Sequence, residues 1–154
     1  MSKPFHVKWP RIVNFHNVGK TLSKYPELTN GESRVIYRSK IKLHGTNSSI
    51  QFHKGIPYAQ SRTQVLGTVI DLERGSDNSG FRKFLHQHKE VLTSLAESLM
   101  KSNRNIVTVF GEWVGKGIQK KCSIHQVDPI FAIFAMIESG ETSEDPIKFI
   151  VDPE

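Results

Sequence analysis

A stretch of alternating side chains places the first limit on the fold. Over residues 34–43, apolar and cationic side chains follow one another with a period of two, which predicts a half-buried β-strand. The apolar set is Val35, Tyr37, Ile41 and Leu43, and the cationic set is Arg34, Arg38, Lys40 and Lys42. The chain is expected to turn at Gly45, after the strand. The fold should therefore contain a sheet with one basic strand face.

Lys42 would project from that basic face just before the turn. An ordinary lysine is protonated at neutral pH and is then a poor nucleophile. Lys40 and Arg38 on the same face would disfavour the ammonium form by like-charge repulsion, which suits a lysine that attacks an electrophile. A solvated basic edge is the alternative, and the charge pattern alone favours it.

Composition narrows the class of protein. With 154 residues, 37% of them hydrophobic and 23% charged, the chain is long enough for one soluble domain with a core. A net charge of +6 favours a polyanionic partner, nucleic acid before an acidic membrane. The single cysteine, Cys122, excludes an internal disulfide framework. Without a signal-like N-terminus or a membrane-length apolar run, we expect an intracellular and most simply cytoplasmic protein, with nucleus or organelle left open.

Periodicity and turn residues predict the remaining elements. Strands are expected over residues 48–53, 58–62, 106–110 and 147–151, and the apolar run 130–137 predicts a strand buried on both faces. Helical spacing predicts one long helix over residues 81–104, with Ser79 as its N-cap. His86 and His88 are two positions apart and would not share a helical face, so they are expected at a helix surface or boundary and not as a metal pair.

The N-terminal residues 1–33 contain prolines and a glycine that should interrupt long elements. Gly19-Lys20-Thr21 is similar to the end of a phosphate-binding P-loop, but Asn14 replaces the first glycine of that motif. We therefore expect an N-terminal turn beside the sheet and no phosphate loop.

Three motifs carry a resemblance to a known family. Lys42 to Asn47, Lys-Leu-His-Gly-Thr-Asn, resembles the nucleophile motif Lys-x-His-Gly-Thr-Asn of the RNA ligase 2 family, a group of covalent nucleotidyltransferases. Histidine at position 44 points to RNA ligases over DNA ligases or capping enzymes. Ser61-Arg62 and then Phe-Gly-Glu-x-x-Gly-x-Gly-Ile-Gln, from Phe110 to Gln119, resemble the next motifs in the same order.

The resemblance also implies a role for each matching residue. Lys42 would be the nucleophile, and Phe134, if it is not simply a core residue, would stack on adenine. The ATP-binding residues would be Ile41, Leu43, His44, Asn47, Arg62, Glu112 and Phe134, and the candidates for RNA contact are Thr46, Lys116, Lys120 and Lys121. ATP and Mg²⁺ are the implied cofactors, with the metal ligands left open. The implied partner is RNA with 5′-phosphate and 3′-hydroxyl ends.

The resemblance is incomplete in two places. Ala135 stands where the family often has an acidic residue, and residues 140–154 match neither of the two later family motifs. We therefore expect residues 1–154 to form a single, C-terminally truncated adenylyltransferase domain. Its expected class is α+β, an antiparallel sheet around a nucleotide cleft with the 81–104 helix on the outer face.

The expected function is ATP-dependent RNA ligation through lysyl-AMP. An inactive nucleotide- or RNA-binding module is the alternative, and a DNA ligase or capping-type transferase is a less favoured one. The sequence leaves the RNA substrate and the oligomeric state open.

Overall fold

The structure of the chain is a computed structural model that describes residues 4–10, 14–29, 41–102, 106–120, 123–140, 142 and 148–149. The chain divides into two compact units, one made of residues 1–9 with 43–154 and the other of residues 10–42. The expectation of a single, truncated domain stays a prediction.

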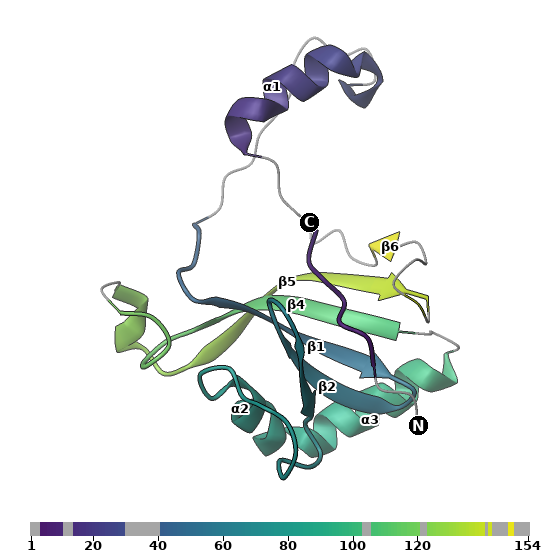
Figure 1. The fold of residues 1–154 in the computed structure, drawn as a ribbon, viewed down its shortest axis with the longest axis vertical. Helices are drawn as coiled ribbons and strands as arrows, with labels where there is room; N and C mark the ends of the chain where they lie inside the picture. Colours follow the sequence, from purple (N-terminus) through teal and green to yellow (C-terminus); the bar gives the residue numbers. More distant parts are fainter. Residues whose placement is uncertain are drawn as a thin grey trace. The chain divides into compact units, whose positions relative to one another are not determined.

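An antiparallel sheet is the centre of the larger unit. Its strands lie in the order β3-β2-β1-β4-β5-β6 (Figure 1). Their bounds are Thr46–His53 (β1), Ile56–Ser61 (β2), Val65–Thr68 (β3), Ile106–Val114 (β4), Ile130–Ser139 (β5) and Lys148–Phe149 (β6). Each neighbouring pair is antiparallel. With helices packed on it, the sheet confirms the α+β class.

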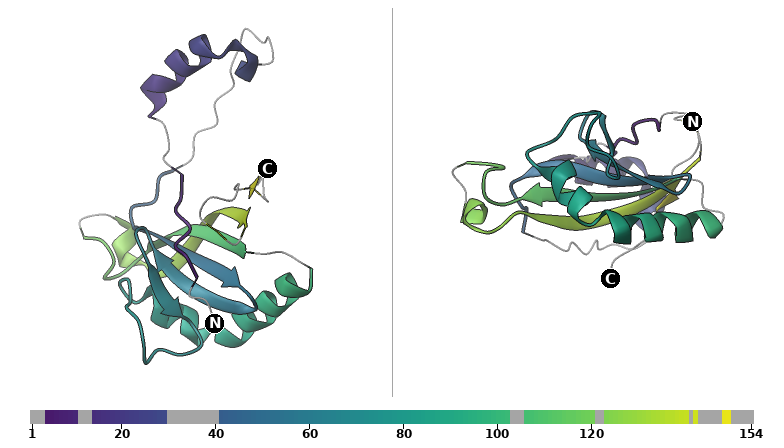
Figure 2. Two further views of the ribbon diagram at one scale, coloured as in Figure 1. Left: turned by 45° about the vertical axis from the view of Figure 1, so that its right-hand side comes forward. Right: turned by 90° about the horizontal axis from the view of Figure 1, so that it is seen from below.

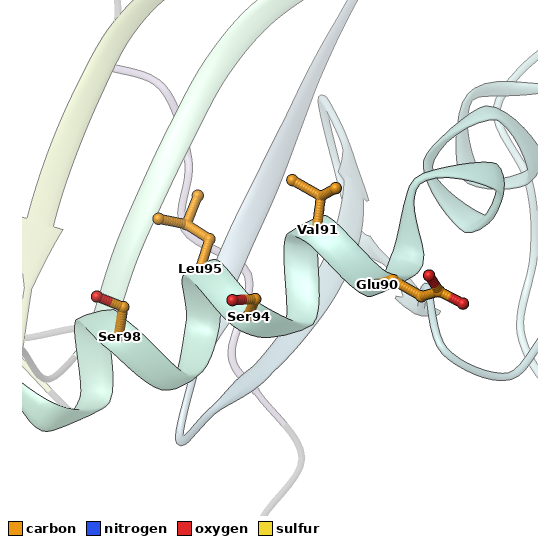
Figure 3. Close-up of a pocket in the computed structure, with 5 residues that line it drawn as sticks. All are labelled: Glu90, Val91, Ser94, Leu95 and Ser98. Atoms are coloured by element: carbon orange, nitrogen blue, oxygen red, sulfur yellow. The ribbon is translucent and has the colours of Figure 1, made fainter.

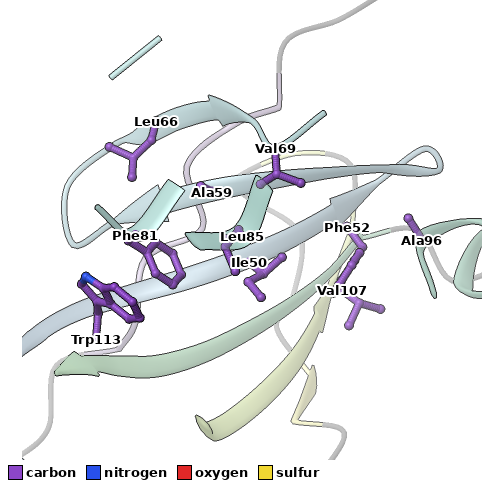
Figure 4. Close-up of a cluster of buried hydrophobic side chains, with 10 residues drawn as sticks. All are labelled: Ile50, Phe52, Ala59, Leu66, Val69, Phe81, Leu85, Ala96, Val107 and Trp113. Carbon is purple, nitrogen blue, oxygen red and sulfur yellow. The ribbon is translucent and has the colours of Figure 1, made fainter. Parts of the chain in front are cut away.

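Helices α2 (Phe81–Gln87) and α3 (Lys89–Lys101) cover one face of this sheet (Figure 2). Alternation along the strands supplies the buried side chains beneath them, because every second residue of β1 and β4 points to that face. Figure 4 shows the resulting core, formed by Ile50, Phe52, Ala59, Leu66, Val69, Phe81, Leu85, Ala96, Val107 and Trp113. Fully burying one of the Val, Leu, Ile or Phe side chains of this core contributes about 1.5–3 kcal/mol.

The prediction of one helix over residues 81–104 is wrong at His88, which lies between α2 and α3. Its backbone has φ −109° and ψ 17°, outside helical values, and its N–H bonds to the Leu85 carbonyl three residues back. The predicted cap is also wrong, because the N-cap is Gly80. The Arg82 backbone N–H in the first turn donates to Asp77 Oδ1 at 2.8 Å.

The opposite face of the sheet is crossed by residues 4–9, called here the N-terminal strap (Figure 1). Val7 is buried against a second core cluster formed by Ile106, Phe110, Ala135 and Ile137. The Phe5 carbonyl accepts a hydrogen bond from Gln51 Nε2 at 3.1 Å, and His6 Nε2 lies 3.1 Å from the Ser61 carbonyl oxygen. The strap is therefore tied to β1 and β2 and packs on β4 and β5.

The strands expected at 48–53 and 106–110 are confirmed as parts of β1 and β4, and the last strand is seen at Lys148–Phe149. The strand expected at 58–62 is confirmed only up to Ser61, where β2 ends before Arg62. The expected strand over residues 34–43 is wrong where it is described, because residues 41–44 have no regular structure and β1 begins at Thr46. Ile41 is 92% exposed, so its apolar side chain does not join the core. Residues 34–40 lie outside the described residues.

The apolar run 130–137 does form a strand, but the prediction that both of its faces are buried is wrong. Ile130, Ile133 and Phe134 are 47%, 63% and 40% exposed. These residues are exposed because β6, the neighbour of β5 at the edge of the sheet, is short. It pairs only with Ile137 and Glu138, near the end of β5. The start of β5 therefore has no further strand beside it among the described residues.

In the smaller unit, the expected N-terminal turn is instead helix α1 (Phe15–Lys24), followed by a 3₁₀ turn at Pro26–Thr29. Gly19-Lys20-Thr21 lies within this helix, whereas in a P-loop these residues would open one. The expected N-terminal turn is therefore corrected to a helix at these residues. No helix in the described ranges is long and apolar enough to cross a membrane.

Candidate active site

One row across the sheet brings predicted residues together. Asn47 of β1 is the direct partner of Glu112 of β4, and Glu112 is the partner of Ala132 of β5. Directly opposed residues in antiparallel strands project to the same face, with Cβ atoms about 4.5–5.5 Å apart. Ser61, the last residue of β2, opposes Ser48, so Arg62 follows at this same end of the sheet. This row is called the Asn47–Glu112 row below.

Phe134 lies beside this row at an irregularity in β5. Phe110 pairs with Ala135 and Gly111 pairs with Ile133, so Phe134 is the extra residue of a β-bulge. Such a bulge redirects a side chain. The ring of Phe134 is 40% exposed, so it is not the core residue that an apolar strand would suggest.

Aromatic contacts fix the face on which Phe134 lies. Trp9 of the strap contacts Phe134 with ring centroids 5.0 Å apart and contacts Phe110 at 5.1 Å. Phe110 is two residues before Glu112 in β4, so both side chains project to the face crossed by the strap. The structure therefore brings Asn47, Glu112 and Phe134 to one face of the sheet.

Gly45, in the nucleophile motif, is held by two side chains of the Phe110–Gln119 motif. Its N–H donates to Glu112 Oε1 at 3.0 Å, and its carbonyl accepts from Gln119 Nε2 at 3.2 Å. Its tight approach to β4 leaves no space for a side chain, since an added Cβ would overlap the Trp113 carbonyl oxygen and Val114 Cγ1. Gln119 is part of the predicted motif, but its role in holding Gly45 depends on a tertiary contact that the sequence does not show.

The start of β1 is also held from the helix-covered face. Asn78 Nδ2 donates to Ser48 Oγ at 3.1 Å and to Thr46 Oγ1 at 3.4 Å. Thr46 opposes Trp113 and so projects to that face, away from Asn47. The RNA-contact candidate Thr46 is therefore not gathered with the Asn47–Glu112 row.

Arg82, which lies in none of the sequence motifs, orders the loop that carries Asn78. Its side chain is 3% exposed, and each guanidinium nitrogen donates to backbone carbonyls. Nε reaches Thr68 at 2.9 Å, Nη2 reaches Asp71 at 2.6 Å and Arg74 at 2.5 Å, and Nη1 reaches Ser76 at 3.4 Å. Such an arginine looks like a surface residue in a sequence, because the carbonyls it binds carry no sequence signal.

The remaining predicted residues are mostly exposed. Lys42 and Ile41 are the last residues of the 10–42 unit, and both side chains are exposed. In the larger unit, Leu43 is half-buried and His44, Arg62, Lys116 and Lys120 are exposed. Lys121 lies outside the described residues. The basic groups near the 115–120 turn are thus accessible to a polyanion.

The larger unit also contains a phenol with a shifted pKa and two histidines near the ends of helices. Burial raises the pKa of the Tyr58 phenol above its usual 10.0. Within the described ranges, no three His, Cys, Asp or Glu side chains cluster as a metal site would require. His86 Nδ1 lies 2.7 Å from the Val69 carbonyl oxygen and His88 separates two helices, which confirms their expected boundary positions.

A hollow on helix α3 does not belong to this site. Figure 3 shows its lining side chains, Glu90, Val91, Ser94, Leu95 and Ser98. Helix α3 covers the face of the sheet opposite to Asn47 and Glu112, so the hollow lies apart from the row.

The comparison with known families agrees with the motifs gathered here. A family model described as RNA ligase matches residues 38–147, a span that includes Lys42, Arg62, Glu112 and Phe134. This α+β chain therefore belongs to the RNA ligase family. No curated protein matches the chain.

Proposed function

We propose that this chain is an ATP-dependent RNA ligase that forms lysyl-AMP on Lys42. Membership of the RNA ligase family supports RNA joining in general. The observation that carries the finer proposal is the hydrogen bond from Gly45 N–H to Glu112 Oε1, which links two motif stretches 67 residues apart. The bond holds Gly45, the glycine of the motif that begins with Lys42, against the motif that contains Glu112.

In the proposed first step, the neutral amine of Lys42 attacks the α-phosphorus of ATP. The Nζ–P bond forms, the bond from the α-phosphorus to the oxygen bridging to the β-phosphate breaks, and pyrophosphate leaves with that electron pair. The nitrogen loses one proton to solvent. The product is a phosphoramidate that stores the adenylate for transfer.

Two further displacements at phosphorus would complete ligation. An oxygen of the RNA 5′-phosphate attacks the adenylate phosphorus, the Nζ–P bond breaks with its electron pair on nitrogen, and Lys42 takes up one proton from solvent and leaves as the amine. The 3′-hydroxyl of the second RNA end then attacks the activated 5′-phosphorus, loses its proton, and releases AMP. RNA with these two ends is accordingly the proposed substrate.

The Asn47–Glu112 row offers groups that fit ATP recognition. Phe134 presents an exposed ring for stacking on adenine. Ala132, beside Glu112, is small enough to leave room for a planar ring. Arg62 can pair with phosphate or ribose oxygens through its planar fork, and Asn47 offers both a donor and an acceptor.

Exposed lysines near the row fit an RNA partner. Lys116 and Lys120 lie in the turn that follows β4, and the chain carries a net charge of +6. Lysines neutralise phosphates without reading sequence, so binding through them should weaken as salt rises.

The described residues contain no cluster of three or more His, Cys, Asp or Glu side chains that could bind a magnesium ion. Mg²⁺ is usually held by one or two carboxylates together with substrate phosphates. Glu112 is the carboxylate of the row, and its Oε1 already accepts the Gly45 N–H. The ion is proposed to bind the ATP triphosphate only. The three displacements at phosphorus are assigned to the chain and its substrates.

Covalent labelling tests the proposal. With ATP labelled in the α-phosphate, the wild-type chain should acquire label that survives denaturation and alkali but is released by acid, as expected of a phosphoramidate, and with ATP labelled in the γ-phosphate it should not. Lys42→Ala should abolish labelling and Lys42→Arg should not restore it, because a guanidinium stays protonated. Persistent α-label on Lys42→Ala would refute the assignment.

A binding module without chemistry is the second candidate. It is favoured by the engagement of the Glu112 carboxylate with backbone, which leaves that side chain less open to a ligand. This candidate predicts salt-sensitive binding of ATP or RNA with no lysyl-AMP at any magnesium concentration.

A further inference from the structure

Three aromatic rings on the strap-covered face contact one another in a line. Phe110 of β4 packs against Trp9 of the strap at 5.1 Å with 55° between the ring planes. Trp9 in turn packs against Phe134 at 5.0 Å with 77° between the planes. Phe110 is 2% exposed, so the line runs from a buried ring to the exposed ring of Phe134.

Phe134 needs support from outside its own strand. As the extra residue of the bulge it has no directly opposed partner on β4, and its ring is 40% exposed. An exposed aromatic side chain with few neighbours changes rotamer easily. A ring that is to stack on a base must instead be held in one orientation before the base arrives.

The strap can provide that support because it is anchored ahead of Trp9. The Phe5 carbonyl is bonded by Gln51, His6 lies against the Ser61 carbonyl, and Val7 is 3% exposed. Trp9 follows two residues after Val7. Its ring therefore reaches Phe134 from a segment that is tied to the sheet at three successive positions.

We propose that Trp9 is a positioning residue that sets the orientation of the Phe134 ring for stacking on the adenine of ATP. This inference rests on the proposed function. The near-perpendicular contact leaves at least one face of Phe134 uncovered by Trp9, so the pair supports the ring and keeps a face for the base. Trp9 acts through Phe134 and is assigned no contact with the reacting atoms.

The test compares two truncations of the strap. Trp9→Ala removes the contact with Phe134, whereas Phe5→Ala trims a side chain on the same core cluster but keeps the Phe5 carbonyl that anchors the strap to Gln51, and is the matched control. In Trp9→Ala, the KM for ATP in lysyl-AMP formation should rise about 3- to 10-fold while kcat changes less than about twofold. Phe5→Ala should leave KM within about twofold, and Trp9→Phe should recover part of the loss.

Fluorescence adds a readout that a purely structural role would not move. The chain has two tryptophans, and Trp113 is 2% exposed in the helix-side core with its Nε1 bonded to the Ser79 carbonyl. ATP should change the emission of the wild-type chain. This change should be absent in Trp9→Phe, in which Trp113 still emits.

The possible outcomes separate this inference from the function on which it rests. If the wild type forms lysyl-AMP but Trp9→Ala and Phe5→Ala share one KM, the positioning role is overturned and the ligase proposal stands. If the wild type binds ATP without forming lysyl-AMP, the dissociation constants replace KM in the same comparison and decide it. If the wild type neither binds ATP nor forms lysyl-AMP, both proposals fall.

Discussion

The carboxylate of Glu112 on β4 accepts the backbone N–H of Gly45 at 3.0 Å, three residues after Lys42. The bond links the third motif of the chain to the first and fixes the segment that enters β1. Gln119, at the end of the same motif, donates a hydrogen bond to the Gly45 carbonyl oxygen. Both backbone polar groups of Gly45 are therefore hydrogen-bonded. Gly45, in the first motif, is thus held by two side chains of the third motif.

Replacing Glu112 should separate its structural role from a direct role toward ATP. Glu112→Ala removes the acceptor for Gly45 N–H, and a charged hydrogen bond contributes about 1.5–3 kcal/mol, so lysyl-AMP formation should slow by about 10- to 150-fold. Glu112→Gln keeps an acceptor oxygen and should retain most of the rate if positioning is the main role. The measurement is the initial rate of covalent adenylation. Equal loss in both variants would instead assign the importance to the negative charge.

Gly45→Ala should destabilise the larger unit. An added Cβ would overlap the Trp113 carbonyl oxygen and Val114 Cγ1, so β1 must move away from β4 at a cost of about 1–3 kcal/mol. The matched control is Gly19→Ala within α1, where no atom lies within 4 Å and alanine should stabilise the helix by about 0.5–1 kcal/mol. Thermal unfolding should show a lower Tm for Gly45→Ala only. An unchanged Tm for Gly45→Ala would contradict the tight approach to β4.

Arg82 should matter for stability although it lies outside every motif. Arg82→Met keeps much of the apolar stem but leaves the four carbonyls of the 68–76 loop without their donor, so the free energy of unfolding should fall by about 2–4 kcal/mol. The exposed neighbour Lys83, changed to Met, is the control and should alter it by less than about 0.5 kcal/mol. Urea denaturation measures both. Similar values for the two variants would argue against the buried role of Arg82.

Stability at alkaline pH should report the burial of Tyr58. Because burial raises its pKa in the folded state, the unfolded phenol loses its proton first as pH rises above 10.0, and deprotonation then favours unfolding. The stabilisation is present below pH 10.0 and is lost as pH rises through the folded-state pKa. Tyr58→Phe lacks this loss, so the wild type should weaken relative to the variant between about pH 9 and about pH 11. A constant difference in unfolding free energy across that interval would contradict the shift.

The sequence predicted those strands for which the alternation of side chains and the flanking turn residues indicate the same element. Strands β1, β2 and β4 were found because alternation and turn residues agree there, and the order of the motifs pointed to Glu112 as a site residue. The same period of two misled over residues 41–43, because alternation records an extended preference and not whether a partner strand is present.

The features that the sequence did not predict depend on tertiary contacts. The bulge at Phe134 is a difference in register between β4 and β5, which no single strand encodes. The interruption at His88 lies within an apolar pattern that continues on both sides of it. The role of Arg82 comes from backbone carbonyls, which every residue carries. The line of rings through Trp9 joins segments more than a hundred positions apart in the chain.

The most direct test of the account is the intact mass of the chain after incubation with ATP and magnesium, followed by peptide mapping. The account predicts the addition of one adenylate, located on the peptide that contains Lys42, and its loss when pyrophosphate is added in excess. An unchanged mass, or an adenylate on a different lysine, would contradict it.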